Sequence, residues 1–204
     1  MTPHVEDENI NILTGSYTLL DPGAGTVELD LGCGSGSYTV ALAQRYPDRK
    51  IYAADVMIGR LRKLVRHTRR AGVENISVLR VEARHLVGMM LPDSSLDRIH
   101  LLCPDPWPKD RHRGHRLLCC DFTTQIHRVL KENGIFHFSS DDVNYCAAVG
   151  RVMEASGLFE AADEALSDLQ GIVSDFERRW NSQGLAVSHR AWRKLPLPEI
   201  TIGH

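Results

Sequence analysis

Residues 27–36 read Val-Glu-Leu-Asp-Leu-Gly-Cys-Gly-Ser-Gly, and this stretch predicts a strand that turns into a helix. Val27 to Leu31 is a short, largely apolar run typical of a strand, and the residues from Ser37 to Tyr46 have helical spacing. The glycines between them let the backbone turn sharply and approach a ligand at the positive end of the helix. Their G-x-G-x-G spacing departs from the G-x-G-x-x-G of dinucleotide sites. We therefore expect this turn to bind a ligand.

The rest of the chain alternates between strand and helix patterns. Apolar runs predict strands over 50–54, 76–81, 96–103 and 135–139, and an alternating run predicts a last strand over 185–192. Helical patterns predict helices over 56–71, 117–130 and 143–156, with a loop over 89–94, a helix stop over 131–134 and a further helix opening at Ser174. Residues 158–170 are ambiguous. The alternation predicts an α/β fold with a doubly wound, largely parallel sheet and helices on both faces.

Acidic residues stand where several predicted strands end, which is the edge of an open α/β sheet that binds ligands. Asp55 lies 19 residues after Gly36. Its carboxylate could bind a ribose diol, and it could equally well cap the N-terminus of the following helix. Glu82 ends the strand 76–81. After the strand 135–139, Asp142 is best explained as a helix cap, whereas Asp141 fits either a cap or a binding role.

Residues 101–116 read Leu-Leu-Cys-Pro-Asp-Pro-Trp-Pro-Lys-Asp-Arg-His-Arg-Gly-His-Arg. Pro104 has no N–H for a sheet, so it ends the strand before it. The prolines at 104, 106 and 108 stiffen the backbone around Asp105 and Trp107, and the basic residues that follow suit the phosphate oxygens of RNA. A solvated basic loop is the alternative, but it gives no reason for the proline-caged Asp and Trp.

Length and composition fit one globular domain, with 204 residues, 43% hydrophobic and 25% charged. A formal net charge of −2 excludes a generally basic surface, so RNA affinity would come from residues 60–70 and 109–116, which hold ten of the 24 Lys and Arg residues. A solvated helix face explains residues 60–70 equally well. Five cysteines without Cys-x-x-Cys spacing favour a reducing cytoplasm. No apolar run approaches the roughly 18 residues that span a membrane, and His112-x-x-His115 lacks the partner ligands of a metal site.

The chain resembles the bacterial tRNA (guanine-N7)-methyltransferase family of class I enzymes from about Val27 to Trp192. The residues that carry the resemblance are 29–36, 104–109 with Arg111 and His112, 140–141 and 174–177. The resemblance implies a Rossmann-like sheet, S-adenosylmethionine as cofactor, and methyl transfer to N7 of a variable-loop guanine in tRNA. Residues 1–25 show no clean periodicity, so we expect a lead-in there with little regular structure. One methyltransferase domain over 26–195 and a tail over 196–204 are expected to follow.

The same resemblance assigns roles to single residues. Asp105 is the implied catalytic acid. The implied cofactor site consists of Asp30, Gly32, Gly34, Gly36, Asp55, Glu82 and Asp105. The implied contacts to tRNA are Lys109, Asp141, Ser174, Asp175, Phe176 and Glu177. Contacts to the RNA backbone are expected from Arg111, His112, Arg113 and Arg116.

Three departures from the family pattern concern the tRNA contacts. The run from Arg113 to Arg116 carries fewer fixed charges than the family's Lys-Arg-Arg, and serines replace threonines before Asp141 and at 174.

The chemistry needs no base, because guanine N7 already has a lone pair. It needs in-line placement, which is worth roughly 7–11 kcal/mol of the barrier, and a carboxylate near the developing charge.

Two other functions fit parts of the sequence. A nicotinamide-dependent oxidoreductase would also use a glycine loop and an acid at Asp55. A non-catalytic RNA-binding module on a methyltransferase fold would explain the thinned basic loop, but the intact acids at 30, 55, 105 and 141 argue against it.

Overall fold

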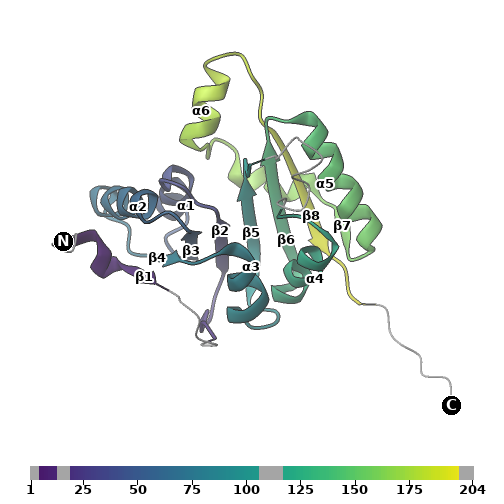
Figure 1. Cartoon of the computed structure of the whole chain (residues 1–204), viewed down its shortest axis with the longest axis horizontal. Helices are drawn as coiled ribbons and strands as arrows, with labels where there is room; N and C mark the ends of the chain where they lie inside the picture. The colour runs from purple at the N-terminus through teal and green to yellow at the C-terminus, as the bar shows by residue number, and fades with distance from the viewer. Residues whose placement is uncertain (1–4, 13–18, 106–116, 198–204) are drawn as a thin grey trace.

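The computed structural model describes residues 5–12, 19–105 and 117–197, and in them the chain forms one eight-stranded sheet (Figure 1). The strands run in the order β1-β4-β3-β2-β5-β6-β8-β7, and β8 alone runs in the direction opposite to the other strands. Their bounds are β1 Ile10–Ile12, β2 Val27–Leu31, β3 Lys50–Asp55, β4 Ile76–Arg80, β5 Leu96–Leu102, β6 Leu130–Ser140, β7 Phe159–Ala161 and β8 Ser188–Lys194.

Helices cover both faces of this sheet. They are α1 Ser37–Arg45, α2 Ile58–Ala71, α3 Ala83–His85, α4 Cys120–Val129, α5 Val143–Ser156 and α6 Asp175–Asn181, with a π-helical turn Leu86–Met90 and 3-10 helices Val5–Asn9 and Asp163–Leu169. The π-helical turn, α4 and α5 pack on one face, and α1 and α2 pack on the other. In Figure 1, α6 stands beyond the carboxyl ends of β5 and β6. None of the helices in the described ranges combines the length and apolar character needed to cross a membrane.

Strand β2 lies inside the sheet and is buried along its whole length. Val27, Leu29 and Leu31 point into the largest apolar cluster, as the two-residue period of a strand requires. Glu28 and Asp30 alternate with them toward α1, and they are only 1% and 2% exposed. Two carboxylates buried this deeply need hydrogen-bond partners. Thr39 binds Asp30, and Arg49 and His100 bind Glu28.

The predicted doubly wound, largely parallel sheet is confirmed. The predicted ends of α2 and α5 are also confirmed, because Gly72 and Gly157 terminate them in the left-handed conformation, with φ of 65° and 64°. The prediction that residues 1–25 have little regular structure is wrong for residues 10–12, which form β1 parallel to β4. A strand of three residues is too short to show a period of two.

Two further boundaries differ from prediction. Met89 and Met90 belong to the π-helical turn rather than to a loop. Strand β6 begins at Leu130, directly after α4, whereas the sequence predicted a helix to residue 130 and a strand only from 135. The expected helix stop is instead an irregular part of the strand, where Asn133 has a φ of 59° and the pairing with β5 shifts register. The ion pair between Lys131 Nζ and Asp97 Oδ2, 2.7 Å long, links this segment to β5.

Candidate active site

The glycine turn after β2 has the left-handed backbone that its sequence predicts. Gly32, Gly34 and Gly36 have φ values of 80°, 58° and 78°. A Cβ on Gly32 or Gly34 would meet nothing within 4 Å, whereas a Cβ on Gly36 would lie 2.1 Å from Leu64 Cδ1. The first two glycines therefore leave room for a ligand. The third lets the start of α1 pack against α2.

Asp55, at the end of β3, holds this turn in place. Its Oδ2 accepts a hydrogen bond from the Gly34 N–H at 3.1 Å, and its Oδ1 accepts one from the Met57 N–H at 2.8 Å. Met57 is the N-cap of α2, so Asp55 lies two residues before the position of a conventional cap. The Arg60 guanidinium lies 3.7 Å away. Asp55 is 7% exposed and lines a cavity. Its contact with the Met57 N–H gives it a role at the start of α2, and its binding of a ribose diol stays a prediction.

That cavity, of about 520 Å³, lies at the carboxyl ends of β2, β3, β4 and β5. Gly32, Asp55, Glu82 and Asp105 line it, one from the end of each strand. Its apolar walls come from Leu31, Val56, Met57, Val81, Leu101 and Leu117. Four predicted site residues that are distant in sequence are thus brought to one place, as expected for the ligand-binding edge of an open α/β sheet.

Glu82 and Asp30 also bind the protein itself. The Glu82 carboxylate caps α3 by accepting the His85 N–H at 2.9 Å, and it stays exposed at the cavity. Asp30 lies deeper, where its Oδ2 accepts a hydrogen bond of 2.5 Å from Thr39 Oγ1 of α1. Burial raises the pKa of the Asp30 carboxyl. In the described part of the chain, Asp30 is not among the residues that line the cavity, and its contact stabilises the first turn of α1.

The end of β5 aims Asp105 at the cavity through an unusual turn. Cys103 has a φ of 46° although it precedes Pro104, a position that normally favours extended backbone. Its N–H is held by Ser139 O of β6 at 2.9 Å. Backbone strain of this kind clusters at functional sites. Asp105 is exposed, and the predicted contributors that follow it, Trp107, Lys109, Arg111, His112, Arg113 and Arg116, lie outside the described residues.

The two predicted substrate segments also lie together. Asp141, after β6, accepts a hydrogen bond of 2.6 Å from Trp180 Nε1 of α6. At the start of α6, Ser174 caps the helix by accepting the Glu177 N–H at 3.1 Å, and the Asp175 N–H binds Ser37 Oγ at 2.8 Å. Asp142 caps α5 through the Tyr145 N–H, as predicted.

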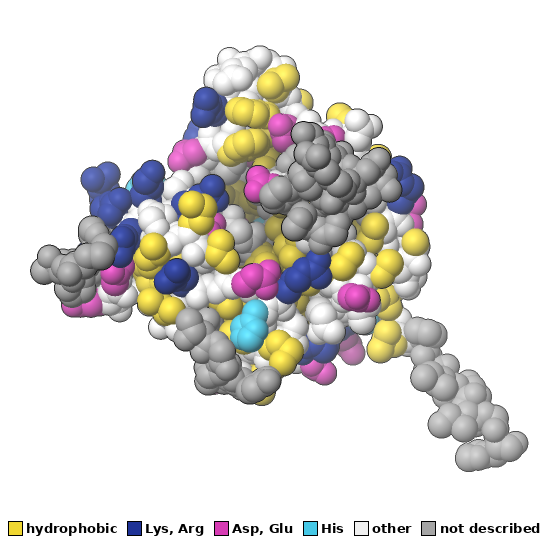
Figure 2. Space-filling model, viewed as in Figure 1, with side chains coloured by type: hydrophobic (Ala, Val, Ile, Leu, Met, Phe, Trp, Pro, Cys, Tyr) yellow, Lys and Arg dark blue, Asp and Glu magenta, His cyan; other side chains and the backbone are white. Residues whose placement is uncertain are grey.

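Aromatic and basic side chains surround this edge of the sheet. Phe176 and Trp180 of α6 pack with ring centroids 4.6 Å apart, and Phe176 is 39% exposed. Helix α2 buries Leu61, Leu64 and Val65 and carries the predicted basic residues of 60–70 on its other faces. Figure 2 shows Lys and Arg side chains gathered at the side of the molecule where α2 lies in Figure 1.

Sequence reasoning missed Trp180 and a row of histidines that is buried at one end and partly exposed at the other. His100, His137 and His189 lie on β5, β6 and β8 and connect Glu28 to Glu177. The available signal was a polar residue at alternate positions of apolar strands, as in Ile99-His100-Leu101 and Phe136-His137-Phe138. Such a residue faces the side of the sheet opposite the apolar core.

Comparisons with known proteins place the chain in a family. The family model described as "Putative methyltransferase" matches residues 24–189. Several proteins named tRNA (guanine-N(7)-)-methyltransferase are similar to this chain. One from Caulobacter vibrioides is 32% identical over 81% of this chain and 74% of its own length, and one from Geobacter metallireducens is 31% identical over 84% and 83%. The chain spans half the length of a third, from Thermotoga maritima, at 28% identity over 78% of this chain.

Solved structures share the fold at low sequence identity. A 16S rRNA methyltransferase, KamB, matches with a TM-score of 0.61 at 17% identity, over 84% of this chain and 89% of its own. A 16S rRNA (adenine(1408)-N(1))-methyltransferase from Catenulisporales acidiphilia, with cosubstrate SAM, matches with a TM-score of 0.58 at 18% identity, over 89% and 95%. Family model, relatives and fold agree, and the chain belongs to the bacterial tRNA (guanine-N7)-methyltransferase family of class I methyltransferases.

Proposed function

We propose that this protein is an S-adenosylmethionine-dependent tRNA (guanine-N7)-methyltransferase that modifies a guanine of the variable loop, in the cytoplasm. The observation that carries the proposal is the meeting of Gly32, Asp55, Glu82 and Asp105 at one cavity beyond four neighbouring strands. Membership of the family and the names of its relatives support the choice of substrate. They also favour methyl transfer over a nicotinamide-dependent reaction.

The residues at the cavity fit S-adenosylmethionine. The backbone is open at Gly32 and Gly34, where an added Cβ would meet nothing within 4 Å, so a ligand can approach the turn closely. The Asp55 and Glu82 carboxylates can accept hydrogen bonds from ribose hydroxyls and the adenine amine, and the apolar walls suit an adenine ring. When bound, the cofactor supplies an electrophilic sulfonium methyl group.

The tRNA would meet the protein at α6 and Asp141. Phe176 and Trp180 offer a partly exposed aromatic pair, which suits stacking on an unpaired base. The carboxylates of Asp141 and Glu177 suit the N–H donors of guanine. Basic side chains of α2 lie on the same side as the cavity, since Arg60 lines it, and they suit the phosphate backbone.

The residues of the protein would place guanine rather than activate it. Because guanine N7 carries a lone pair, no proton would have to leave for it to accept the methyl group that the bound cofactor would supply. Positive charge appears on the base, where the Asp105 carboxylate can stabilise it. The left-handed turn at Cys103 supports this role, because it would fix the direction in which the chain carries Asp105 past the end of β5.

The decisive experiment is incubation of the full chain with unmodified tRNA and methyl-labelled S-adenosylmethionine, followed by nucleoside analysis. We expect the label in N7-methylguanosine. Label in another nucleoside would overturn the position of transfer. Binding of S-adenosylmethionine and tRNA with no transfer would instead support the non-catalytic RNA-binding module.

The role of Asp105 is tested by Asp105→Asn, which keeps size and turn preference but removes the charge. We expect the variant to bind tRNA normally and to lose roughly 2.7–4 kcal/mol of transition-state stabilisation, a hundredfold or more in rate. Single-turnover methylation at saturating tRNA and cofactor measures this directly. A rate within threefold of the parent would show that Asp105 only shapes the loop.

A further inference from the structure

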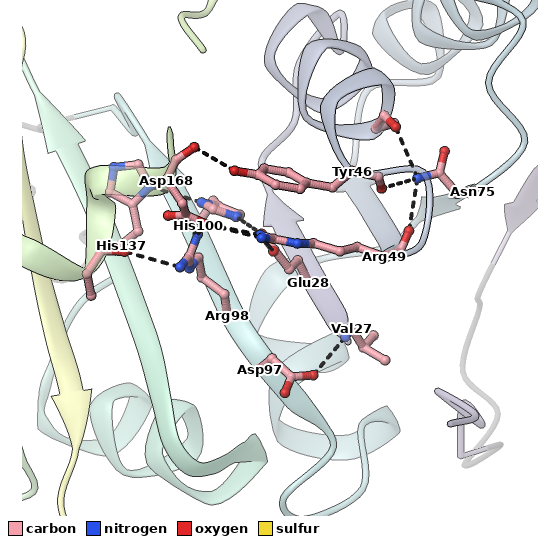
Figure 3. Close-up of polar contacts among 12 residues, drawn as sticks. Val27, Glu28, Tyr46, Arg49, Asn75, Asp97, Arg98, His100, His137 and Asp168 are labelled. Atoms are coloured by element: carbon pink, nitrogen blue, oxygen red, sulfur yellow. Dashed lines mark hydrogen bonds and ion pairs between the residues drawn. The ribbon is translucent and has the colours of Figure 1, made fainter. Parts of the chain in front are cut away.

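A continuous row of five side chains crosses the sheet beneath the proposed substrate helix. His100 Nε2 lies 2.7 Å from Glu28 Oε2, His100 Nδ1 lies 2.9 Å from His137 Nδ1, and His137 Nε2 lies 2.9 Å from His189 Nδ1. His189 Nε2 then lies 3.1 Å from Glu177 Oε1 of α6. Figure 3 shows the inner end of the row, with Glu28, His100 and His137. We call these five residues the histidine row.

The histidine row runs from the core to a cavity. The side chains of Glu28 and His100 are 1% and 0% exposed, whereas those of Glu177 and His189 are 13% and 29% exposed. The outer residues and His137 line a cavity of about 410 Å³ between α6, the 3-10 helix Asp163–Leu169 and the sheet. The inner contact is therefore shielded from water, and the outer one can exchange protons with solvent.

Counting protons shows what these four contacts require. Each contact joins two nitrogen or oxygen atoms, so each needs one proton to be a hydrogen bond. A neutral histidine carries one ring proton and an ionised carboxylate carries none, so three neutral histidines supply three protons. Four contacts between two carboxylates therefore need one additional proton.

The charges around the row show where this proton can reside. Burial alone would raise the pKa of Glu28, but the hydrogen bond and charge of His100, with Arg98 and Arg49, outweigh it and lower the pKa to about 2. Burial, with His100 and His189 beside it, lowers the pKa of His137 well below its ordinary value. Glu28 is thus ionised and His137 neutral. If Glu177 is ionised as well, the additional proton belongs to His100 or His189. Moving the proton of each intervening hydrogen bond to the partner atom converts one form into the other.

The other groups that face the row do not supply the missing proton. They are Tyr38 of α1, Arg49 before β3, Asp30 of β2, Arg98 of β5, and Asp163, Glu164 and Asp168 of the 3-10 helix. The Tyr38 hydroxyl, 3.3 Å from His100 Nδ1, keeps its proton because burial raises its pKa. The count is unchanged, since the contact between the two Nδ1 atoms still needs a proton of its own. Asp168 pairs with Arg49 and Arg98.

We propose that His100, His137 and His189 share one additional proton between Glu28 and Glu177, and that through it His189 and His137 are positioning residues that hold α6 for tRNA. The positioning role of His189 and His137 rests on the proposed function. As the pH rises and the proton leaves, one contact brings two acceptors together. The shielded contact at Glu28 is kept, because an unpaired buried carboxylate is costly. The contact between His189 and Glu177 is lost instead, and α6 loosens.

The proton count can be measured without any assay of activity. Nitrogen-15 NMR of the full chain, labelled at histidine, distinguishes protonated from bare ring nitrogens, with the three rings assigned through their strand backbones. At pH 6 we expect four protonated nitrogens among the six of His100, His137 and His189. A count of three, five or six at that pH would overturn the proposal.

Glu177→Gln provides a matched test, because its amide can donate to His189 Nε2 and so supply the missing proton. Three neutral histidines then satisfy all four contacts, and we expect the count at pH 6 to fall to three. His127→Gln is the control, since His127 is a buried histidine outside the row that binds Leu195 O. Four protonated nitrogens in Glu177→Gln, or three in the control, would overturn the count.

Positioning is tested by methylation kinetics. His189→Leu removes both ring contacts and should raise the KM for tRNA about tenfold with little change in kcat. His189→Gln keeps a donor and an acceptor, so its KM should be closer to that of the parent. In the parent, KM should rise with pH as the proton leaves. A pH-independent KM, or equal KM values for both variants, would overturn the positioning role. A parent that shows the expected count but methylates no tRNA would contradict the proposed function and leave the shared proton standing.

Discussion

At the scale of the residue, Gly36 shows why the glycine turn has a third glycine. An added Cβ would lie 2.1, 2.8 and 2.9 Å from three side-chain atoms of Leu64, and the φ of 78° is unfavourable for any L-residue. We expect Gly36→Ala to lower the free energy of unfolding by at least about 2 kcal/mol, since overpacking costs roughly 1–3 kcal/mol and a left-handed residue roughly 1–2. Urea denaturation at 25 °C measures the change.

A matched control lies on the helix that Gly36 contacts. Gly59, in the first turn of α2, is exposed, and an added Cβ would meet nothing within 4 Å. Gly59→Ala should therefore stabilise the protein by up to about 1 kcal/mol, because alanine favours helix. If both variants shifted the free energy of unfolding equally, the packing role of Gly36 would be wrong.

At the scale of the element, α6 is attached to the domain by side chains rather than by a core. None of its residues is buried, and Trp180 links it to Asp141. We expect Trp180→Phe to speed amide hydrogen exchange in α6 about fivefold, since a partly exposed hydrogen bond to a carboxylate contributes about 1 kcal/mol. The amides of α5 serve as the internal control. Unchanged exchange in α6, or faster exchange throughout, would contradict this attachment.

The elements also show how far sequence reasoning reaches. The glycine turn, the strand ends that carry Asp55 and Asp105, and the stop of α2 at Gly72 follow from local rules of backbone and capping, so they could be predicted. The contact between Asp141 and Trp180, 39 residues apart, could not. It depends on how α6 folds back over the sheet, and no local pattern encodes that path. The pairing of β1 with β4 was missed for the same reason.

At the scale of the whole molecule, buried titratable groups make stability depend on pH. The pKa of Glu28 is lowered from 4.5 to about 2, so its stabilisation is complete above about pH 4.5 and is lost as the pH falls to 2. The difference corresponds to about 3 kcal/mol. His137 acts in the same direction, because burial lowers its pKa below 6.5 and the unfolded chain then binds a proton that the folded chain does not.

We therefore expect His137 and then Glu28 to lower the free energy of unfolding as the pH is lowered from 7 to 3. Asp30, whose pKa is raised by burial, acts in the opposite direction. Urea titrations across this range measure the net change. His137→Asn should flatten the curve between about pH 6.5 and 5 and leave the steeper fall below pH 4.5. A parent curve that is flat across the whole range would contradict the burial of both groups in their present charge states.

The two edges of the sheet affect how readily one molecule can pair with another. In the described residues the outermost strands are β1 and β7, and each has only three residues. A short edge offers few unpaired N–H and C=O groups to a second sheet. β1 also covers β4, a five-residue strand whose open ladder would otherwise be a template for adding strands from other chains. By pairing with β4, β1 leaves a shorter open edge, which disfavours edge-to-edge aggregation in a concentrated solution.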